Sequence, residues 1–134
     1  MVSYTFQKDE KLCSQKVIGE IFLSGTSFLC YPFKVVWKFE SLPSVFPIQV
    51  MFSVPKRLFK RAHDRNLLKR RMREVYRVKK DQLYHLAAVN RKQIALILVY
   101  IAKEELEFIQ LDEAMDKVIR RFQKNPELQN KNET

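Results

Sequence analysis

The sequence predicts a single-domain α+β protein, an α/β sandwich with the element order α-β-β-α-β-α. Its length of 134 residues is that of one domain. Hydrophobic residues make up 46% of the chain and include ten Phe, which is enough to build a core. Along the chain, segments with apolar residues at helical spacing alternate with segments at strand spacing. We assign residues 1–125 to the domain and the polar residues 126–134 to a disordered tail.

The N-terminal part of the chain predicts one helix and two strands. Apolar residues recur at helical spacing over 11–24, and Gly25 follows as a helix stop. Residues 28–40 alternate, with one parity wholly apolar and the other mixed, as in a strand with one buried face. Pro32 places part of this strand at an edge or a bulge. After a loop with two prolines, residues 48–54 form the second strand.

The C-terminal part predicts a helix, a strand and a last helix. The first of these helices begins near Arg65, with Asp64 as its N-cap. Residues 93–102 are apolar on both faces, which predicts a strand at the centre of the sheet. The last helix covers 111–125, with Asp112 as its N-cap. Its apolar stripe consists of Leu111, Met115, Val118, Ile119 and Phe122.

All of the net positive charge lies in one stretch, residues 56–80. This stretch has twelve Lys or Arg and two acids, a local charge of +10, which equals the charge of the whole chain. On a helical wheel of about 3.6 residues per turn, its bases gather on one arc and its apolar residues on another. The basic arc holds Arg65, Asn66, Lys69, Arg70, Arg73, Arg77 and Lys80. The apolar arc holds Leu68, Met72, Val75, Leu83 and Leu86, with Tyr76 at its border.

Three interpretations of this basic helix can be weighed. A solvated surface helix usually mixes charge signs and pairs Glu with Lys, whereas here like charges repel along one face. An interfacial membrane helix needs a free apolar face, but the core of so small a domain needs that face itself. Nucleic acid fits best, because Arg binds phosphate through a bidentate fork and four further bases precede the helix in PKRLFKR, at 55–61.

Several other classes of protein are disfavoured. Only two Gly occur in the chain, which argues against a Gly-rich phosphate loop. The N-terminus has no secretory signal, and the longest apolar run, 94–102, is nine residues long, whereas a membrane helix needs about 20. We therefore expect a cytoplasmic protein in which Cys13 and Cys30 are buried or partly buried free thiols.

The titratable residues do not form a recognisable catalytic set. His63 lies among arginines, where we expect it to touch phosphate or nothing, and His85 is expected to pack against the fold. No His or Cys residues have the spacing of a zinc site. Asp112, Glu113 and Asp116 are interpreted as charges at a helix N-terminus rather than as metal ligands. We therefore assign no catalytic residue and no metal ligand to the protein.

The segment DRNLLKRRMREVYR, at 64–77, resembles the Arg-Asn-Arg signature helix of the bacterial ribonuclease P protein family. The matching residues are Arg65, Asn66, Lys69, Arg70 and Arg73. Leu67 stands where the family has its third signature Arg, which removes one potential RNA contact without changing the spacing of the others. FSVPKR, at 52–57, resembles the strand that leads to the family's Lys-Lys pair, and the whole resemblance covers about residues 11–124.

The resemblance implies a fold and a division of labour. The family fold is an α/β sandwich with a left-handed β-α-β crossover around the signature helix. In this family the RNA subunit carries the active site, and metal ions bound by RNA, with magnesium expected, activate the water that removes the 5′ leader from precursor tRNA. The protein binds the RNA subunit and holds the leader, so it is the non-catalytic subunit of a ribonucleoprotein endoribonuclease.

The basic stretch, the strand alternation and the resemblance together predict two binding surfaces. The RNA-binding residues are Lys56, Arg57, Lys60, Arg61, Arg65, Asn66, Lys69, Arg70, Arg73 and Arg77. The leader-binding residues, at the end of the first helix and on the mixed face of the first strand, are Phe22, Lys34, Val36 and Lys38. The family commonly has an aromatic residue at the position of Val36. The alternative for Phe22 is an ordinary core residue.

Two other functions remain open beside the ribonuclease P protein subunit. One is a different RNA-binding protein, such as a ribosomal protein, and the other is a DNA-binding or membrane-surface protein. The partners we expect are the ribonuclease P RNA subunit and the precursor-tRNA 5′ leader, with neither membrane nor DNA. Co-purified RNA would distinguish the three functions, as a long structured RNA, ribosomal RNA or none.

Overall fold

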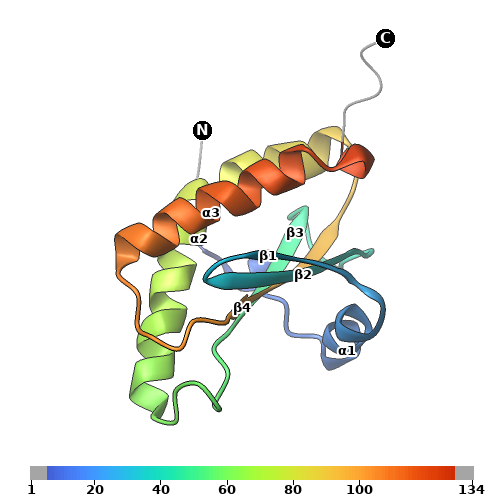
Figure 1. Cartoon of the computed structure of the whole chain (residues 1–134). Coiled ribbons are helices and arrows are strands. Elements are labelled where there is room, and N and C mark those ends of the chain that lie inside the picture. The colour runs from blue at the N-terminus through green and yellow to red at the C-terminus, as the bar shows by residue number, and fades with distance from the viewer. Residues whose placement is uncertain (1–5, 129–134) are drawn as a thin grey trace.

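The computed structural model describes residues 6–128, which form one four-stranded sheet with helices on both faces (Figure 1). The helices are α1 (Gln15–Ser24), α2 (Ala62–Val89) and α3 (Phe108–Gln123), with short 3-10 helices η1 (Lys8–Glu10) and η2 (Pro126–Leu128). The strands are β1 (Thr26–Cys30), β2 (Phe33–Phe39), β3 (Ile48–Ser53) and β4 (Ile94–Tyr100). α2 and α3 cover one face of the sheet and α1 covers part of the other. The predicted α+β sandwich is confirmed.

The segment 28–40, predicted as one strand, is instead part of a β-hairpin. β1 and β2 pair antiparallel, with Thr26 opposite Trp37. The turn between the two strands contains the cis peptide Tyr31–Pro32. Proline has no N–H to donate to a sheet ladder, so the first strand ends here. The predicted order of elements is confirmed once this first strand is divided in two.

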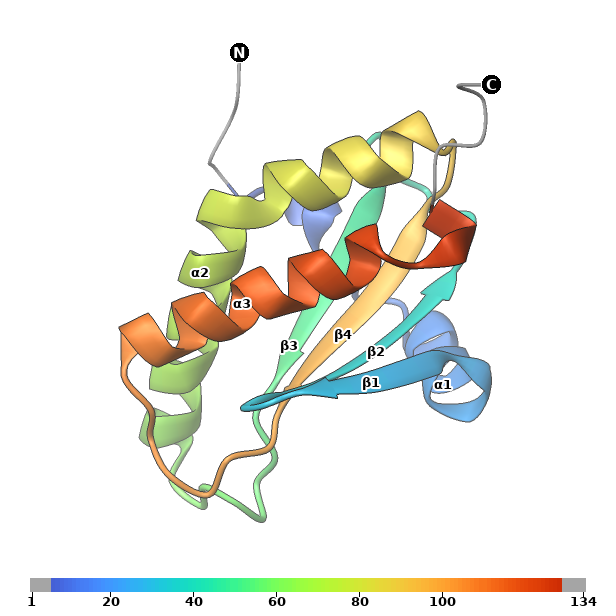
Figure 2. The ribbon, with the colours of Figure 1, turned by 45° about the horizontal axis from the view of Figure 1, so that its top comes forward.

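The strands are arranged in the order β1-β2-β4-β3, so β1 and β3 are the edges. The predicted central position of 93–102 is confirmed, because β4 pairs antiparallel with β2 and parallel with β3. α2 connects the two parallel strands. In Figure 2 both strands run downward, β4 lies to the right of β3, and α3, which shares the larger core on the same face of the sheet as α2, lies in front. This crossover is therefore left-handed, the opposite of the usual hand.

The sheet separates two cores. The larger one lies under α2 and α3 and contains Phe33, Val35 and Trp37 of β2. The whole stripe predicted for the last helix is buried in it, as are Leu68, Met72, Val75, Tyr76 and Leu83 of α2, with Leu86 half-buried. The smaller core joins Ile21 of α1 to Val36 and Ile97 of the sheet. The amphipathic faces predicted for both long helices are thus confirmed.

Both predicted helix caps are wrong, because each helix begins before the residue chosen as its cap. Asp64 lies in the first turn of α2. α3 begins after Glu107, the N-cap residue of a capping box, so Asp112 lies within the helix. Phe108 and Ile109, in the first turn of α3, are exposed and lie outside the apolar stripe. The stripe therefore marks the buried part of α3 and not its start.

A buried ion pair holds the N-terminal segment against α2. Lys80, predicted on the basic face, is only 3% exposed and pairs with Glu10, which is 0% exposed. The Tyr84 hydroxyl donates to the same carboxylate over 2.7 Å, and the backbone N–H of Gln7 donates over 2.6 Å. Lys80 is therefore a structural residue, because the segment before α1 covers this part of the helix.

Gly25 allows α1 and the hairpin to approach closely. A Cβ atom at this position would lie 2.5 Å from the carbonyl oxygen of Ile21 and 2.9 Å from that of Trp37. Both atoms belong to the backbone, so they cannot move aside as the end of a side chain could. The residue interpreted as a helix stop is required by this contact.

The chain continues beyond α3 into η2, whose Leu128 is buried in the larger core. The side-chain amide of Asn90, just after α2, donates to the Leu128 carbonyl over 2.8 Å. Residues 126–128 therefore pack on the domain. The rest of the predicted tail, 129–134, lies outside the described residues.

Candidate nucleic-acid interface

The cations of the basic stretch divide into two groups. Four are paired with carboxylates inside the protein. These pairs are Arg71–Glu105, Arg77–Glu74, Lys79 with Asp112 and Asp116, and Lys80–Glu10. The hydrogen bond from Arg77 lowers the pKa of Glu74. Among residues 6–128, the other eight cations of the stretch have no ion pair with a carboxylate.

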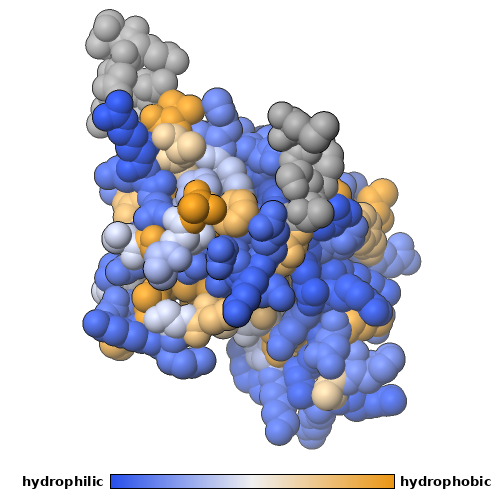
Figure 3. Space-filling model, turned by 180° about the vertical axis from the view of Figure 1, so that it is seen from behind, coloured by the Kyte–Doolittle hydropathy of each residue, from blue (hydrophilic) through white to orange (hydrophobic). Residues whose placement is uncertain are grey.

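The eight cations without carboxylate partners lie together at the N-terminal end of α2 and on the loop before it. With Asn66 they form what we call the α2 basic surface. Its members are Lys56, Arg57, Lys60, Arg61, Arg65, Asn66, Lys69, Arg70 and Arg73. All are exposed except Arg65 and Lys69, which are half-buried. Seen from behind, this part of the molecule, at the lower right of Figure 3, is mainly hydrophilic.

Arg65 contributes a positive charge to the α2 basic surface and also holds the loop 55–61 in place. Its Nη1 donates to the carbonyl oxygens of Phe59 and Lys60, both over 2.8 Å. These bonds hold the loop 55–61 beside the first turn of α2. Phe59 anchors the same loop on Tyr100, with ring centroids 5.8 Å apart. A guanidinium has five N–H donors, so Arg65 keeps donors for a phosphate.

A hollow of about 230 Å³ lies beside this surface, at the edge of the sheet formed by β3. Lys69 and Arg73 line it from α2, and Lys11 lines it from the N-terminal segment. Met51 and Phe52 provide apolar surface between them. Cations beside aromatic surface suit an unpaired nucleotide, which binds through its phosphate and its base. The sequence pattern did not predict this hollow, because it depends on how the N-terminal segment folds against β3.

The family is decided by comparison with known proteins. The family model described as Ribonuclease P matches residues 6–123. The chain belongs to the ribonuclease P protein family. The "Ribonuclease P protein component" of Porphyromonas gingivalis strain W83 is 30% identical over 123 residues, which cover 92% of this chain and 90% of that protein. The protein of the same name from Chlorobium phaeobacteroides is 35% identical over 101 residues, covering 73% and 69%.

Solved structures of ribonuclease P proteins share the fold. The RNase P protein from Thermotoga maritima has a TM-score of 0.64 and 22% identity, covering 84% of this chain and 96% of its own. The RNase P protein from Staphylococcus aureus has a TM-score of 0.66 and 18% identity, covering 84% and 94%. The fold class predicted from the sequence is therefore shown by both the structure and its neighbours.

The basic and amide residues at the ribonuclease P signature positions lie on one side of the first three turns of α2; they are Arg65, Asn66, Lys69, Arg70 and Arg73. Asn66, Arg70 and Arg73 are exposed on consecutive turns. Leu67, at the third signature position, is half-buried. Arg77, also predicted to bind RNA, lies one turn further and is hydrogen-bonded to Glu74 over 2.6 Å. The C-terminal end of the basic arc of α2 is therefore partly neutralised within the protein.

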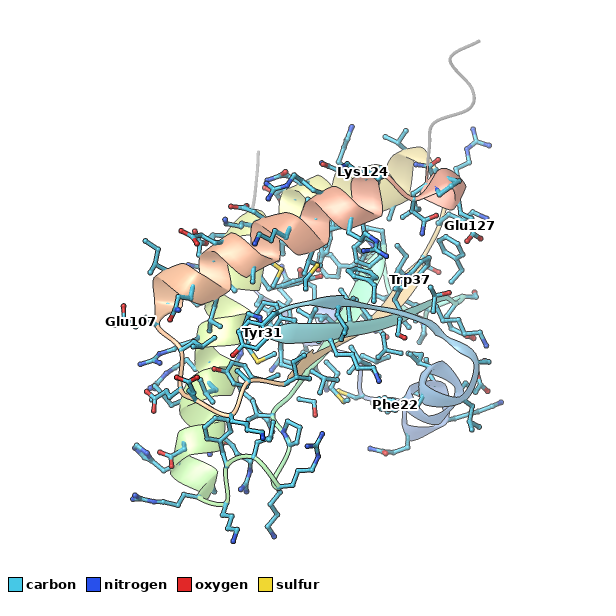
Figure 4. All side chains as sticks on the ribbon, in the orientation of Figure 1. Phe22, Tyr31, Trp37, Glu107, Lys124 and Glu127 are labelled. Atoms are coloured by element: carbon cyan, nitrogen blue, oxygen red, sulfur yellow. The ribbon has the colours of Figure 1, made fainter. Side chains whose placement is uncertain are left out.

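The four residues assigned to the leader do not share one open surface. Val36 is 4% exposed and packs beneath α1 in the smaller core, so it is not available to stack on RNA. Phe22 is 56% exposed, so the alternative of an ordinary core residue is wrong. Lys34 is exposed and Lys38 is half-buried. Figure 4 shows Phe22 on α1, on the face of the sheet away from α2 and α3.

One row of this sheet face is left open by α1. The cross-strand register places Leu29, Lys34, Val99 and Ser53 side by side across all four strands. Neighbours in register point to the same face of a sheet. Leu29 and Lys34 are exposed and the other two are half-buried, whereas the next row, with Val36, is covered. We call these four residues the open row.

The histidines and the acids of α3 do not form a catalytic cluster. His63 is exposed, with Nδ1 3.6 Å from the Asp64 carboxylate. His85 is exposed, so its predicted packing is wrong. The Lys79 ammonium nitrogen of α2 lies 3.1 Å from the Asp112 carboxylate and 2.6 Å from the Asp116 carboxylate, both on α3. These ion pairs join the two helices. Within residues 6–128, no three His, Cys, Asp or Glu side chains are placed to hold a metal ion.

The two cysteines are free thiols in different environments. Cys13 is exposed, so the expectation of at least partial burial is wrong for it. Cys30 is half-buried, and burial raises the pKa of its thiol against the opposing effect of nearby cations on α3. Within residues 6–128, every helix is too short or too polar to span a lipid bilayer.

Proposed function

We propose that this chain is the protein subunit of ribonuclease P. It binds the RNA subunit through the α2 basic surface, holds the 5′ leader of precursor tRNA on Phe22 and the open row, and so assists removal of the leader. The observation that carries the proposal is the group of eight cations without carboxylate partners on and beside the family's signature helix.

The separation of paired cations from cations without carboxylate partners supports binding of a polyanion. Arg71, Lys79 and Lys80 of α2 pack against other elements of the fold, and each is paired there with a carboxylate. At the N-terminal end of α2 like charges are left close together, which costs stability in the free protein. RNA phosphates would neutralise them through charge-assisted hydrogen bonds. Binding of such an anion to the folded state also stabilises that state.

The leader is proposed to bind by stacking and charge, as single strands do. Phe22 supplies the exposed aromatic ring, and the open row supplies Leu29 and Val99 beside the ammonium group of Lys34. Since Val36 is buried, Phe22 replaces it as the stacking platform in this proposal. The protein contributes binding energy and no chemical group. The magnesium ions of the reaction are proposed to be held by RNA.

Two titrations of each variant test these surfaces separately. One measures affinity for the RNA subunit, and the other compares precursor tRNA with mature tRNA on the assembled enzyme. Arg73→Ala should weaken binding of the RNA subunit by about 1–3 kcal/mol, the range for a charge-assisted hydrogen bond. Phe22→Ala and Lys34→Ala should leave that affinity unchanged and reduce the preference for precursor tRNA.

The control is Lys92→Ala, which removes an exposed cation beyond the other end of α2. It should change neither titration, so an equal effect of Lys92→Ala and Arg73→Ala would show that only net charge matters. If Arg73→Ala and Phe22→Ala gave the same pattern in both titrations, the proposal of two separate surfaces would be wrong.

A further inference from the structure

A second group of cations without carboxylate partners lies on the C-terminal half of α3 and at its C-cap residue, Lys124. Lys117, Arg120, Arg121 and Lys124 are all exposed. At about 100° per residue they fall within one arc of roughly 100°, opposite the buried stripe. Among the described residues, none of the four forms an ion pair, although Glu113 and Glu127 stand nearby in the chain. We call these four cations the α3 basic face.

A hollow of about 220 Å³ opens between this face and the edge strand β1. Arg121 and Lys124 line it from α3, and Thr26, Phe28 and Trp37 line it from the hairpin. Figure 4 labels Lys124 on the helix and Trp37 on the sheet below it. The volume is below the roughly 300 Å³ at which sites for whole cofactors begin, so one nucleobase fits better than a larger ligand.

The position of Arg121 is the second feature of this hollow. Its guanidinium lies 4.9 Å from the centroid of the Phe28 ring. Phe28 in turn meets the Phe122 ring edge-on at 5.5 Å. One face of the guanidinium is therefore supported by an aromatic ring, and a guanidinium plane held in this way can stack on a base with its other face.

The helix dipole alone does not explain this arrangement. It favours cations in the last turn of a helix, and Arg120, Arg121 and Lys124 are near the end of α3. It does not account for a hollow with aromatic surface beside them. Nor does it account for the outer side of β1, which pairs with no strand among the described residues and offers backbone donors and acceptors. Cations, aromatic surface and free backbone groups together are the chemistry of a site for single-stranded nucleic acid.

We propose that this hollow binds an unpaired nucleotide of the precursor-tRNA 5′ leader, beyond the nucleotides held at Phe22 and the open row. Its phosphate meets Arg121 and Lys124, and its base stacks on the Arg121 guanidinium. The inference rests on the proposed function and extends the leader-binding surface around the edge of the sheet.

The chain path places the two leader sites next to each other. Phe22 is in the last turns of α1, and β1 begins at Thr26, only four residues later. Their Cα atoms are therefore at most about 14 Å apart. The α2 basic surface lies at the other end of the molecule, at the lower left of Figure 2, whereas the end of α3 is at the upper right. An RNA subunit bound at the start of α2 leaves the hollow accessible to the substrate.

The test is a series of precursor tRNAs whose leaders differ only in length, titrated on the assembled enzyme. The variants are Arg121→Gln and Lys124→Gln. The matched control is Lys92→Gln, because Lys92 also lies over an aromatic ring, 5.0 Å from the Phe39 centroid, but does not line the hollow. With the natural protein, lengthening the leader past the segment held at Phe22 should raise affinity. The two variants should lose most of this gain, roughly tenfold, and keep full affinity for short leaders and for the RNA subunit.

Each other outcome has a distinct meaning. If the natural enzyme does not prefer precursor to mature tRNA at all, the leader part of the proposed function fails. If it does prefer precursor tRNA but the variants match it at every leader length, only the inference about the hollow is wrong. Weakened binding of the RNA subunit by Arg121→Gln would assign the hollow to that RNA and overturn its assignment to the leader. An equal loss with Lys92→Gln would also overturn it, since net charge would then explain the effect.

Discussion

Replacing Glu10 by Met is expected to destabilise the protein strongly, because it leaves the ammonium group of Lys80 without its carboxylate. Lys80 is 3% exposed, and its partner is 0% exposed. Removing one member of a buried ion pair costs about 3–5 kcal/mol, since an uncompensated charge remains in the interior. That is a large share of the roughly 5–15 kcal/mol that stabilise a domain. For a chain of this size, the melting temperature should fall by roughly 10–20 °C.

The companion variants separate the pair from its surroundings. Lys80→Met leaves the carboxylate of Glu10 with only the Tyr84 and Gln7 donors, so it should also be destabilising. The double variant Glu10→Met with Lys80→Met removes both charges and should be less destabilised than either single variant, because apolar replacement of a whole buried pair is often neutral.

Urea unfolding followed by circular dichroism measures the coupling free energy between Glu10 and Lys80. It is applied to the natural protein, the two single variants and the double variant at one salt concentration. A loss below 1 kcal/mol for Glu10→Met would show that Lys80 finds solvent or another partner and that this ion pair is not required for stability. Strict additivity of the two single variants would refute the reasoning as well, because contacting residues in one network do not add.

Three further predictions concern salt, the loop 55–61 and Gly25. If about eight phosphates are neutralised, log K for the RNA subunit should fall with log[salt] at a slope of about −6 to −7, and a slope near zero would remove the electrostatic explanation of the α2 basic surface. Arg65→Ala should speed hydrogen exchange in the loop, because two hydrogen bonds to the Phe59 and Lys60 carbonyls are lost. It should also weaken RNA binding more than Arg73→Ala does. Unchanged exchange would show that Arg65 does not hold the loop. Gly25→Ala should lower the stability measured by thermal unfolding by about 2 kcal/mol, since its Cβ would press on two backbone oxygens, and an unchanged melting temperature would contradict the close contact there.

The sequence predicted the larger elements because their periodicity reflects burial. The stripe of α3 and the apolar arc of α2 are both buried, and β4, apolar on both faces, lies inside the sheet. The hairpin was missed because β1 and β2 continue one alternation across the turn at Tyr31–Pro32. The left-handed crossover followed only from the family resemblance, since local pattern carries no information about the hand of a connection.

The positions and partners of the charged residues were harder to predict from the sequence than the burial of the apolar residues. The charges outside 56–80 sum to zero, so net charge gave no indication of the cations gathered on α3. In the structure, Asp112 and Asp116 of α3 are paired with Lys79 of α2, so they do not neutralise the cations that follow on their own helix. Lys80 is similarly hidden by Glu10, from a segment seventy residues away in the chain. Val36 lies on the predicted face of its strand, but α1 covers it, and strand alternation cannot show which element covers a face.

We propose that the protein supports ribonuclease P through RNA binding and supplies no catalytic group. The test is precursor-tRNA cleavage at limiting magnesium, with the RNA subunit alone, the protein alone and both together. We expect no cleavage by the protein alone and strong stimulation of the RNA subunit by the natural protein. The double variant His63→Ala with His85→Ala should stimulate equally, whereas Arg70→Ala with Arg73→Ala should lose stimulation while remaining folded. Cleavage by the protein alone, or stimulation that depends on the histidines and not on the arginines, would contradict the claim.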